Sequence, residues 1–231
     1  MVSKNKKRAN IIIPIAGLSS RMKNNIPKCL TKLNDNETIL SRQIRIIKQV
    51  YSNPNIILVA GYKIDKIEEA ISKEKGIVLI ENKFYEFSNV GQSIANGLVY
   101  CLDKLPTVIV YGDLVFNKEA LTCLPLCSPS LLIDSYNKNR DKEVGISFSS
   151  GIATNLSYGI NDKWAQITVL DSKSRKEWID FSNNWYAQKY YGFEIINHIM
   201  NTCEFNIVQN DKMKLVEVDA IGDMEEAKLI R

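Results

Sequence analysis

The sequence contains one histidine, His198, among its 231 residues. It lies in an apolar segment, which favours a structural role, so chemistry that needs a histidine base, such as a Ser-His-Asp triad, is disfavoured. The five cysteines are odd in number and scattered, and Cys123 and Cys127 lack the close His and Cys partners of a zinc site. We therefore expect reduced thiols in a cytoplasmic protein.

Long hydrophobic runs and a strong excess of charge are also missing. No apolar stretch approaches the roughly 20 residues that cross a membrane. Residues 11–15 follow a basic cluster, but the stretch is too short for a signal peptide and Pro14 interrupts it. The net charge of +4 does not predict nucleic-acid binding. We expect neither a nucleic-acid nor a membrane partner, and the sequence carries no indication of oligomeric state.

What the sequence does contain is an alternation of short apolar runs and segments of helical periodicity. The predicted strands are residues 11–15, 55–60, 77–80, 107–111 and 131–134, and the predicted helices are residues 37–51, 65–72, 91–102 and 117–124. Strands that alternate with helices in this way predict a parallel sheet covered by helices on both faces.

Beyond residue 140 the pattern changes to short β-like pieces joined by turns. We predict strands at residues 144–148, 153–158, 164–170, 188–196 and 212–218, a helix or loop at 174–184, and a short helix at 197–202. Asp223 with Glu226 three residues on resembles a capping box that opens a last helix at residues 224–231. The predicted fold is a single α/β domain, residues 1–231. It has a Rossmann-like, mostly parallel sheet sandwiched by helices and a small antiparallel β elaboration in the C-terminal half.

The first predicted strand runs into a loop of small residues, Ala16-Gly17-Leu18-Ser19-Ser20, which two cations follow, Arg21 and Lys28. Backbone N–H groups of such a turn, at the carboxyl end of a strand, can cradle a phosphate. Arg21 would add a bidentate fork and Lys28 a point charge. Gly17 alone is typical of an ordinary turn, but the whole string predicts a phosphate-binding loop.

Three carboxylates follow predicted strands, at the sheet edge where α/β proteins bind ligands. Asp113 comes directly after the strand at 107–111, and Glu217 and Asp219 end the strand at 212–218. A lone carboxylate in such a place is more often a turn or cap residue. Beside a cationic phosphate loop, the three together predict a magnesium site, because carboxylates bind Mg²⁺ and Mg²⁺ bridges phosphates.

These motifs resemble those of the NTP-transferase (sugar-nucleotidyltransferase-like) family. Residues 16–22 with Pro27-Lys28 resemble its signature loop, Tyr111-Gly112-Asp113 its metal aspartate, and Glu217-Val218-Asp219 its late Glu-x-Asp motif. Ser19 departs from the pattern, since the family often has Gly there. Residues 82–93, through the spacing of Asn89 and Ser93, are most similar to compact cytidylyltransferases that act on phosphocholine and similar small phosphates.

The resemblance implies an Mg²⁺-dependent transfer of NMP, with CTP the favoured donor, to a small phosphorylated acceptor such as phosphocholine. The acceptor attacks the α-phosphorus in line and pyrophosphate leaves, with no covalent intermediate. Residues 1–140 would be the nucleotide-binding core, and residues 141–231 would hold the acceptor and the last metal-ligand strand. By this resemblance Arg21 would hold the β- and γ-phosphates, and Lys28 would contact the phosphate that is transferred. The metal ligands would be Asp113, Glu217 and Asp219. The residues that would contact the nucleotide are Ala16, Gly17, Ser19, Ser20, Arg21, Tyr62, Asn89, Ser93 and Gly112.

The acceptor pocket is expected among aromatic residues of the C-terminal half. Aromatic rings around a quaternary ammonium form a cation–π cage, and a carboxylate can pair with the same charge. Each ring alone is more often a packing residue. The expected acceptor-binding residues are Tyr158, Trp164, Tyr190, Tyr191 and Glu194.

Three alternatives stay open at this point. One is a sugar-1-phosphate nucleotidyltransferase that makes an NDP-sugar. Another is a GT-A-type glycosyltransferase, although Gly112-Asp113-Leu114-Val115 lacks the Asp-x-Asp that this class usually has. The third is a non-catalytic nucleotide-binding module.

Overall fold

A computed structural model describes residues 7–18, 26–134, 143–220 and 222–230. Its centre is one nine-stranded sheet in the order β5-β4-β1-β6-β11-β8-β12-β10-β9. The strands are β1 (Asn10–Ile15), β4 (Asn55–Ala60), β5 (Ile77–Glu81), β6 (Thr107–Val110), β8 (Ser130–Ile133), β9 (Val144–Ser149), β10 (Ile152–Tyr158), β11 (Trp164–Leu170) and β12 (Asn206–Val208).

The sheet has a parallel half and a mixed half. Strands β5, β4, β1 and β6 pair in parallel, as the alternation of strands and helices predicts. Strand β11 then pairs antiparallel with both β6 and β8, and β10 pairs antiparallel with β12 and β9. The α/β fold class is therefore confirmed, and the antiparallel strands of the C-terminal half continue the first sheet.

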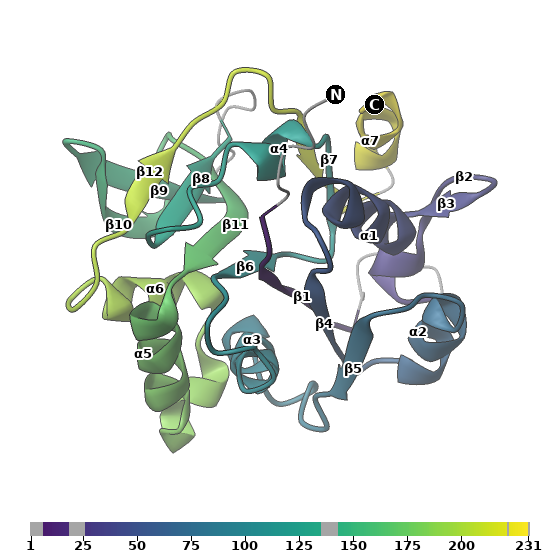
Figure 1. The fold of residues 1–231 in the computed structure, drawn as a ribbon, viewed down its shortest axis with the longest axis horizontal. Helices are drawn as coiled ribbons and strands as arrows, with labels where there is room; N and C mark the ends of the chain where they lie inside the picture. Colours follow the sequence, from purple (N-terminus) through teal and green to yellow (C-terminus); the bar gives the residue numbers. More distant parts are fainter. Residues whose placement is uncertain (1–6, 19–25, 135–142, 221, 231) are drawn as a thin grey trace.

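Helices cover both faces of the sheet because side chains of successive strand residues point to opposite faces. Ile11 and Ile13 of β1 belong to the apolar layer under α1 (Ile39–Val50), α2 (Ile64–Ile71) and α4 (Glu119–Thr122). Ile12 belongs to the opposite layer, under α3 (Val90–Leu98), α5 (Ser172–Ser182) and α6 (Gly192–Ile199). Figure 1 shows α1 and α3 on opposite sides of β1.

Two small antiparallel sheets complete the fold, β2 (Lys32–Asn34) with β3 (Glu37–Thr38), and β7 (Leu114–Phe116) with β13 (Leu215–Glu217). Helix α7 (Asp223–Leu229) packs on β13 and β2, where Met224 and Ala227 join an apolar cluster with Val115 and Val216. Among the residues that the structure describes, no helix is long and apolar enough to cross a membrane.

The strand predicted at residues 188–196 is wrong. This segment holds the end of a 3-10 helix (Trp185–Lys189) and the first residues of α6, so the helix predicted at 197–202 also begins too late. Ile195, Ile196 and Ile199 are fully buried at helical spacing, and the Glu194 side chain accepts a hydrogen bond from the Tyr191 N–H at the helix start. A short apolar run fits either element, and here the cap and the packing decide for the helix.

Candidate active site

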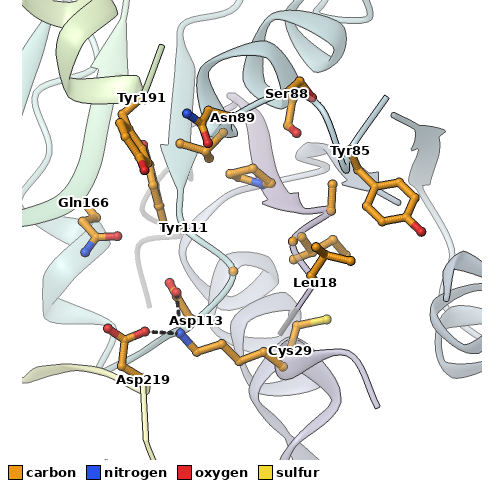
Figure 2. Close-up of a pocket in the computed structure, with 18 of the residues that line it drawn as sticks. Leu18, Cys29, Tyr85, Ser88, Asn89, Tyr111, Asp113, Gln166, Tyr191 and Asp219 are labelled. Atoms are coloured by element: carbon orange, nitrogen blue, oxygen red, sulfur yellow. Dashed lines mark hydrogen bonds and ion pairs between the residues drawn. The ribbon is translucent and has the colours of Figure 1, made fainter. Parts of the chain in front are cut away.

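A pocket of about 580 Å³ opens at the carboxyl end of β1 and β6. Figure 2 shows side chains from distant parts of the chain around it, with Asp113 and Asp219 close together at one end. Its lining residues are Pro14, Ile15, Ala16, Gly17, Leu18, Lys28, Cys29, Tyr85, Glu86, Ser88, Asn89, Val90, Ser93, Tyr111, Gly112, Asp113, Gln166, Tyr191, Glu217 and Asp219. Carboxyl strand ends are the usual ligand site of an open α/β sheet.

The loop after β1 forms one side of the pocket, through Ala16, Gly17 and Leu18. The predicted phosphate-loop residues Ser19, Ser20 and Arg21 lie outside the described residues. Gly112 lies against the end of β1, and a Cβ there would lie 2.2 Å from the side chain of Ile15, so a glycine is needed for the chain after β6 to pass so close to β1.

The pairing of β7 with β13 brings together the three predicted metal ligands. Asp113 precedes β7, and its carbonyl accepts a hydrogen bond from Val218 N at 3.0 Å, between Glu217 and Asp219. Ligand oxygens of Asp113, Glu217 and Asp219 all lie within 4.8 Å of one another. Asp113 thus lies next to Glu217 and Asp219, which follow it by more than 100 residues in the sequence, as expected for one cation site.

The loop that carries Asp219 is held from the start of α7. Oδ2 of Asp223 accepts hydrogen bonds from the backbone N–H groups of Asp219, at 2.8 Å, and Ala220, at 2.7 Å. The predicted capping box at Asp223 is not what the structure shows, because this carboxylate accepts hydrogen bonds from the preceding loop and no side chain of the described residues caps the helix. Asp223 therefore positions Asp219.

Lys28 joins the same cluster. Its Nζ lies 2.9 Å from Oδ2 of Asp113 and 2.5 Å from Oδ1 of Asp219. Burial alone would lower the pKa of Lys28, but the two aspartates outweigh it and the net pKa is raised. The lysine therefore stays charged and can neutralise an anion at this end of the pocket.

The surroundings of Glu217 disfavour its charged form, whereas those of Lys28 favour the charged form. Burial, followed by the nearby charges of Asp113 and Asp219, raises its pKa to about 7. Its Oε2 accepts a hydrogen bond from Nε2 of Gln166 at 2.6 Å, and Nζ of Lys163 lies 4.0 Å away. The carboxyl group thus loses its proton near neutral pH, where a cation would bind it more readily.

The chemistry of the donor set fits a divalent cation. Carboxylate oxygens are the ligands that Mg²⁺ prefers. Oδ1 of Asp113 is buried and has no hydrogen-bond partner among the residues that the structure describes, which is costly unless a cation or a ligand satisfies it. Asp113, Asp219 and Glu217 are therefore the residues that would hold the ion.

Opposite the β1 loop, the pocket wall comes from residues 85–93. Nδ2 of Asn82, a residue only 1 % exposed, donates 3.0 Å hydrogen bonds to Oγ of Ser88 and Oγ of Ser93. Asn89 donates from Nδ2 to the carbonyl of Lys189. The predicted nucleotide-binding residues Asn89 and Ser93 thus line the same pocket as Ala16 and Gly17.

Other predicted site residues lie elsewhere. Tyr62 donates its backbone N–H to the Ala16 carbonyl, 3.2 Å away, but is not a lining residue, and Lys63 Nζ lies 5.3 Å from its ring centroid. Of the five expected acceptor-binding residues, Tyr191 alone lines the pocket described above.

The remaining four residues of that set pack or cap. Trp164 is buried with its ring 5.5 Å from that of Tyr111, Tyr190 packs on Phe181, and Tyr158 packs on Phe193. Glu194 caps α6. Aromatic residues both line pockets and fill cores, so their composition alone does not separate the two roles.

Tyr111, Cys29 and Gln166 are among the lining residues to which the sequence analysis gave no role. Tyr111 precedes the Gly112-Asp113 motif, and its position beside the motif was the available signal. Cys29 follows Lys28, but burial raises the pKa of its thiol to about 12, so it stays protonated and is not a nucleophile. Gln166 gave no sequence signal beyond being polar within the apolar run of residues 164–170.

Comparisons with known proteins agree with this geometry. Residues 11–125 match the family model described as MobA-like NTP transferase domain. The bifunctional protein GlmU of Buchnera aphidicola subsp. Schizaphis graminum is 28 % identical over 228 residues, covering 92 % of this chain and 47 % of that protein. The GlmU of Ruthia magnifica subsp. Calyptogena magnifica is 24 % identical over 246 residues, covering 96 % and 53 %. The chain thus spans about half the length of these curated relatives.

Solved structures share the fold. A CTP:phosphocholine cytidylyltransferase from Streptococcus pneumoniae superposes with a TM-score of 0.78 at 16 % identity, covering 96 % of this chain and 98 % of that one. An inositol-1-phosphate CTP transferase from T. maritima gives 0.76 at 14 % identity, covering 98 % of each chain. A putative glucose-1-phosphate thymidylyltransferase from Bacillus anthracis gives 0.75 at 12 % identity, covering 95 % and 94 %.

Proposed function

Because residues 11–125 belong to the MobA-like NTP transferase family, we propose that the protein is an Mg²⁺-dependent nucleotidyltransferase. It transfers NMP from an NTP, with CTP favoured, to a small phosphorylated acceptor such as phosphocholine, and it releases pyrophosphate. One observation carries the proposal: Lys28 and the carboxylates of Asp113, Asp219 and Glu217 meet at one end of the pocket. A lysine beside a cluster of carboxylates suits a metal-bound triphosphate.

Different residues of the pocket would bind different parts of the substrates. Backbone groups of Ala16 and Gly17, with Asn89 and Ser93 across the pocket, hold the nucleoside. Lys28 stabilises the charge that builds up on the α-phosphate during in-line attack. Mg²⁺, when bound by Asp113, Asp219 and Glu217, would neutralise charge on the triphosphate. The acceptor phosphate is already ionised at neutral pH, so the reaction needs no histidine base.

Tyr191 supports a choline-type acceptor. Its ring lines the pocket, is 47 % exposed, and stacks on Phe193 with a centroid distance of 5.9 Å. An accessible aromatic face attracts a quaternary ammonium group. Sugar 1-phosphates form the second acceptor class, since the hydroxyl groups of Tyr191 and Tyr85, another lining residue, can bond to sugar hydroxyls.

A pyrophosphate-release screen tests the proposal. It crosses the four NTPs with phosphocholine, phosphoethanolamine, glycerol phosphate and several sugar 1-phosphates in the presence of Mg²⁺. We expect CTP with a phospho-alcohol to give the fastest release. Asp113→Asn should abolish it, whereas Asp65→Asn, at an exposed carboxylate of α2, should not change it.

Each other outcome has a definite meaning. Release with sugar 1-phosphates alone would replace the acceptor class and keep the reaction. No release from any pair would favour a non-catalytic nucleotide-binding module. Undiminished release by Asp113→Asn would contradict the metal assignment.

A further inference from the structure

Gln166 has an unusual backbone conformation for its place in a strand. It lies inside β11 with φ at +56°, a left-handed region that residues with a side chain rarely adopt. The pairing of β11 with β8 is irregular at this point, between Trp164 and Thr168. A bulge of this kind bends a strand and redirects a side chain.

In a regular strand, where side chains alternate between the two faces, the Gln166 side chain would lie in an apolar layer. Residues 164 and 170 of β11 lie in the apolar layer beneath α3, α5 and α6, and residue 166 would face the same layer in a regular strand. In the structure Gln166 lines the pocket instead. Figure 2 shows its side chain on the same side of the pocket as Tyr191 and Asp219. The left-handed residue thus moves a polar group from an apolar layer into the site.

The side-chain amide of Gln166 donates a hydrogen bond to Glu217. Nε2 of Gln166 lies 2.6 Å from Oε2 of Glu217, whereas Nζ of Lys163 lies 4.0 Å from the same oxygen and 2.7 Å from Oε1 of Glu143. Glu217 is also repelled by Asp113 and Asp219. The amide hydrogen bond is therefore the short contact that opposes this repulsion and fixes the direction of the carboxylate.

We propose that Gln166 is a positioning residue, whose left-handed backbone aims its amide at Glu217 and so orients the third carboxylate of the divalent-cation site. The inference rests on the proposed function, because it assumes that this cluster binds a cation. Strained backbone persists mainly where the structure gains a function from it. Groups that hold a metal's ligands in this way commonly change metal affinity by about 10- to 100-fold when removed.

The experiment measures Mn²⁺ binding to the full-length chain, without nucleotide, by electron paramagnetic resonance, and thermal unfolding in EDTA. Gln166→Gly removes both the amide and the backbone strain, and Gln166→Leu removes the amide alone. Ser150→Gly is the matched control, because Ser150 also has a positive φ, of 50°, but lies in the exposed turn between β9 and β10.

We expect both Gln166 variants to weaken Mn²⁺ binding by about tenfold. The unfolding midpoint of Gln166→Gly should not fall, and Ser150→Gly should bind Mn²⁺ like the wild type. Wild-type Mn²⁺ affinity in both Gln166 variants would overturn the inference and leave the proposed function standing. A lower midpoint for Gln166→Gly together with weaker binding would also overturn it, in favour of a purely structural role. Absence of Mn²⁺ binding by the wild type would instead contradict the metal site itself.

Discussion

Replacing Glu217 with glutamine should stabilise the metal-free protein at alkaline pH. Burial and the charges of Asp113 and Asp219 raise the pKa of Glu217 to about 7, from an ordinary 4.5. The folded protein therefore holds this proton more tightly than the unfolded chain does. Below pH 4.5 the group is protonated in both states and costs nothing. As the pH rises towards 7, only the unfolded chain ionises readily, so the free energy of unfolding falls.

The size of the effect follows from the same pKa values. A rise from 4.5 to about 7, at about 1.4 kcal/mol per pKa unit, corresponds to about 3 kcal/mol once the group is ionised in both states. Glutamine has the same shape, carries no charge, and can still accept the hydrogen bond from Gln166. Glu217→Gln should therefore gain up to about 3 kcal/mol at pH 8 and less than about 1 kcal/mol at pH 5.

Urea unfolding in EDTA at these two pH values measures the difference. Glu81→Gln, at an exposed carboxylate that ends β5, is the control and should change stability little at either pH. Adding Mg²⁺ should narrow the gap at pH 8, because the ion binds the folded wild type and stabilises it. A Glu217→Gln protein no more stable than wild type at pH 8, or a gap equal at both pH values, would refute the reasoning.

Three further substitutions test other parts of the site. Lys28→Met should lower turnover at least 100-fold, because the ammonium group stabilises charge on the transferring phosphate. It should not weaken Mn²⁺ binding, because this ammonium group contacts the carboxylate oxygens that the ion would bind. Weaker Mn²⁺ binding in electron paramagnetic resonance titrations would contradict this. Asp223→Ala should weaken Mn²⁺ binding several-fold by releasing the Asp219 loop, and unchanged affinity would deny it that role. Gly192→Ala should cost about 1–3 kcal/mol in urea unfolding, since its Cβ would lie 2.2 Å from the Tyr111 hydroxyl; wild-type stability would show that the ring can move.

The parallel half of the sheet was predictable because each strand carries its own signal. The apolar runs at β1, β4, β5 and β6 and the helical periods between them are local properties. The insertion of β11 between β6 and β8 was not predictable, since it depends on pairing between segments more than 30 residues apart. Local patterns therefore predicted the elements of the parallel half, and the partners of the later strands needed the structure.

The candidate site divides in the same way. Asp113, Glu217 and Asp219 were identified from their positions after strands, but their meeting depends on the pairing of β7 with β13. Tyr191 and Trp164 looked equivalent in the sequence, whereas one lines the pocket and the other fills the core. Gln166 lines the pocket with a left-handed backbone conformation, which its residue type did not predict.

The central claim is that this pocket transfers a nucleotidyl group from a metal-bound triphosphate. It is tested most directly by following CTP labelled at the α- or the γ-phosphate through one turnover with phosphocholine and Mg²⁺. We predict that the α-label appears in the acceptor product and the γ-label in pyrophosphate, and that both transfers are lost in Asp113→Asn. Release of the γ-label as inorganic phosphate, or an α-label that never leaves CTP with any acceptor tried, would contradict the claim.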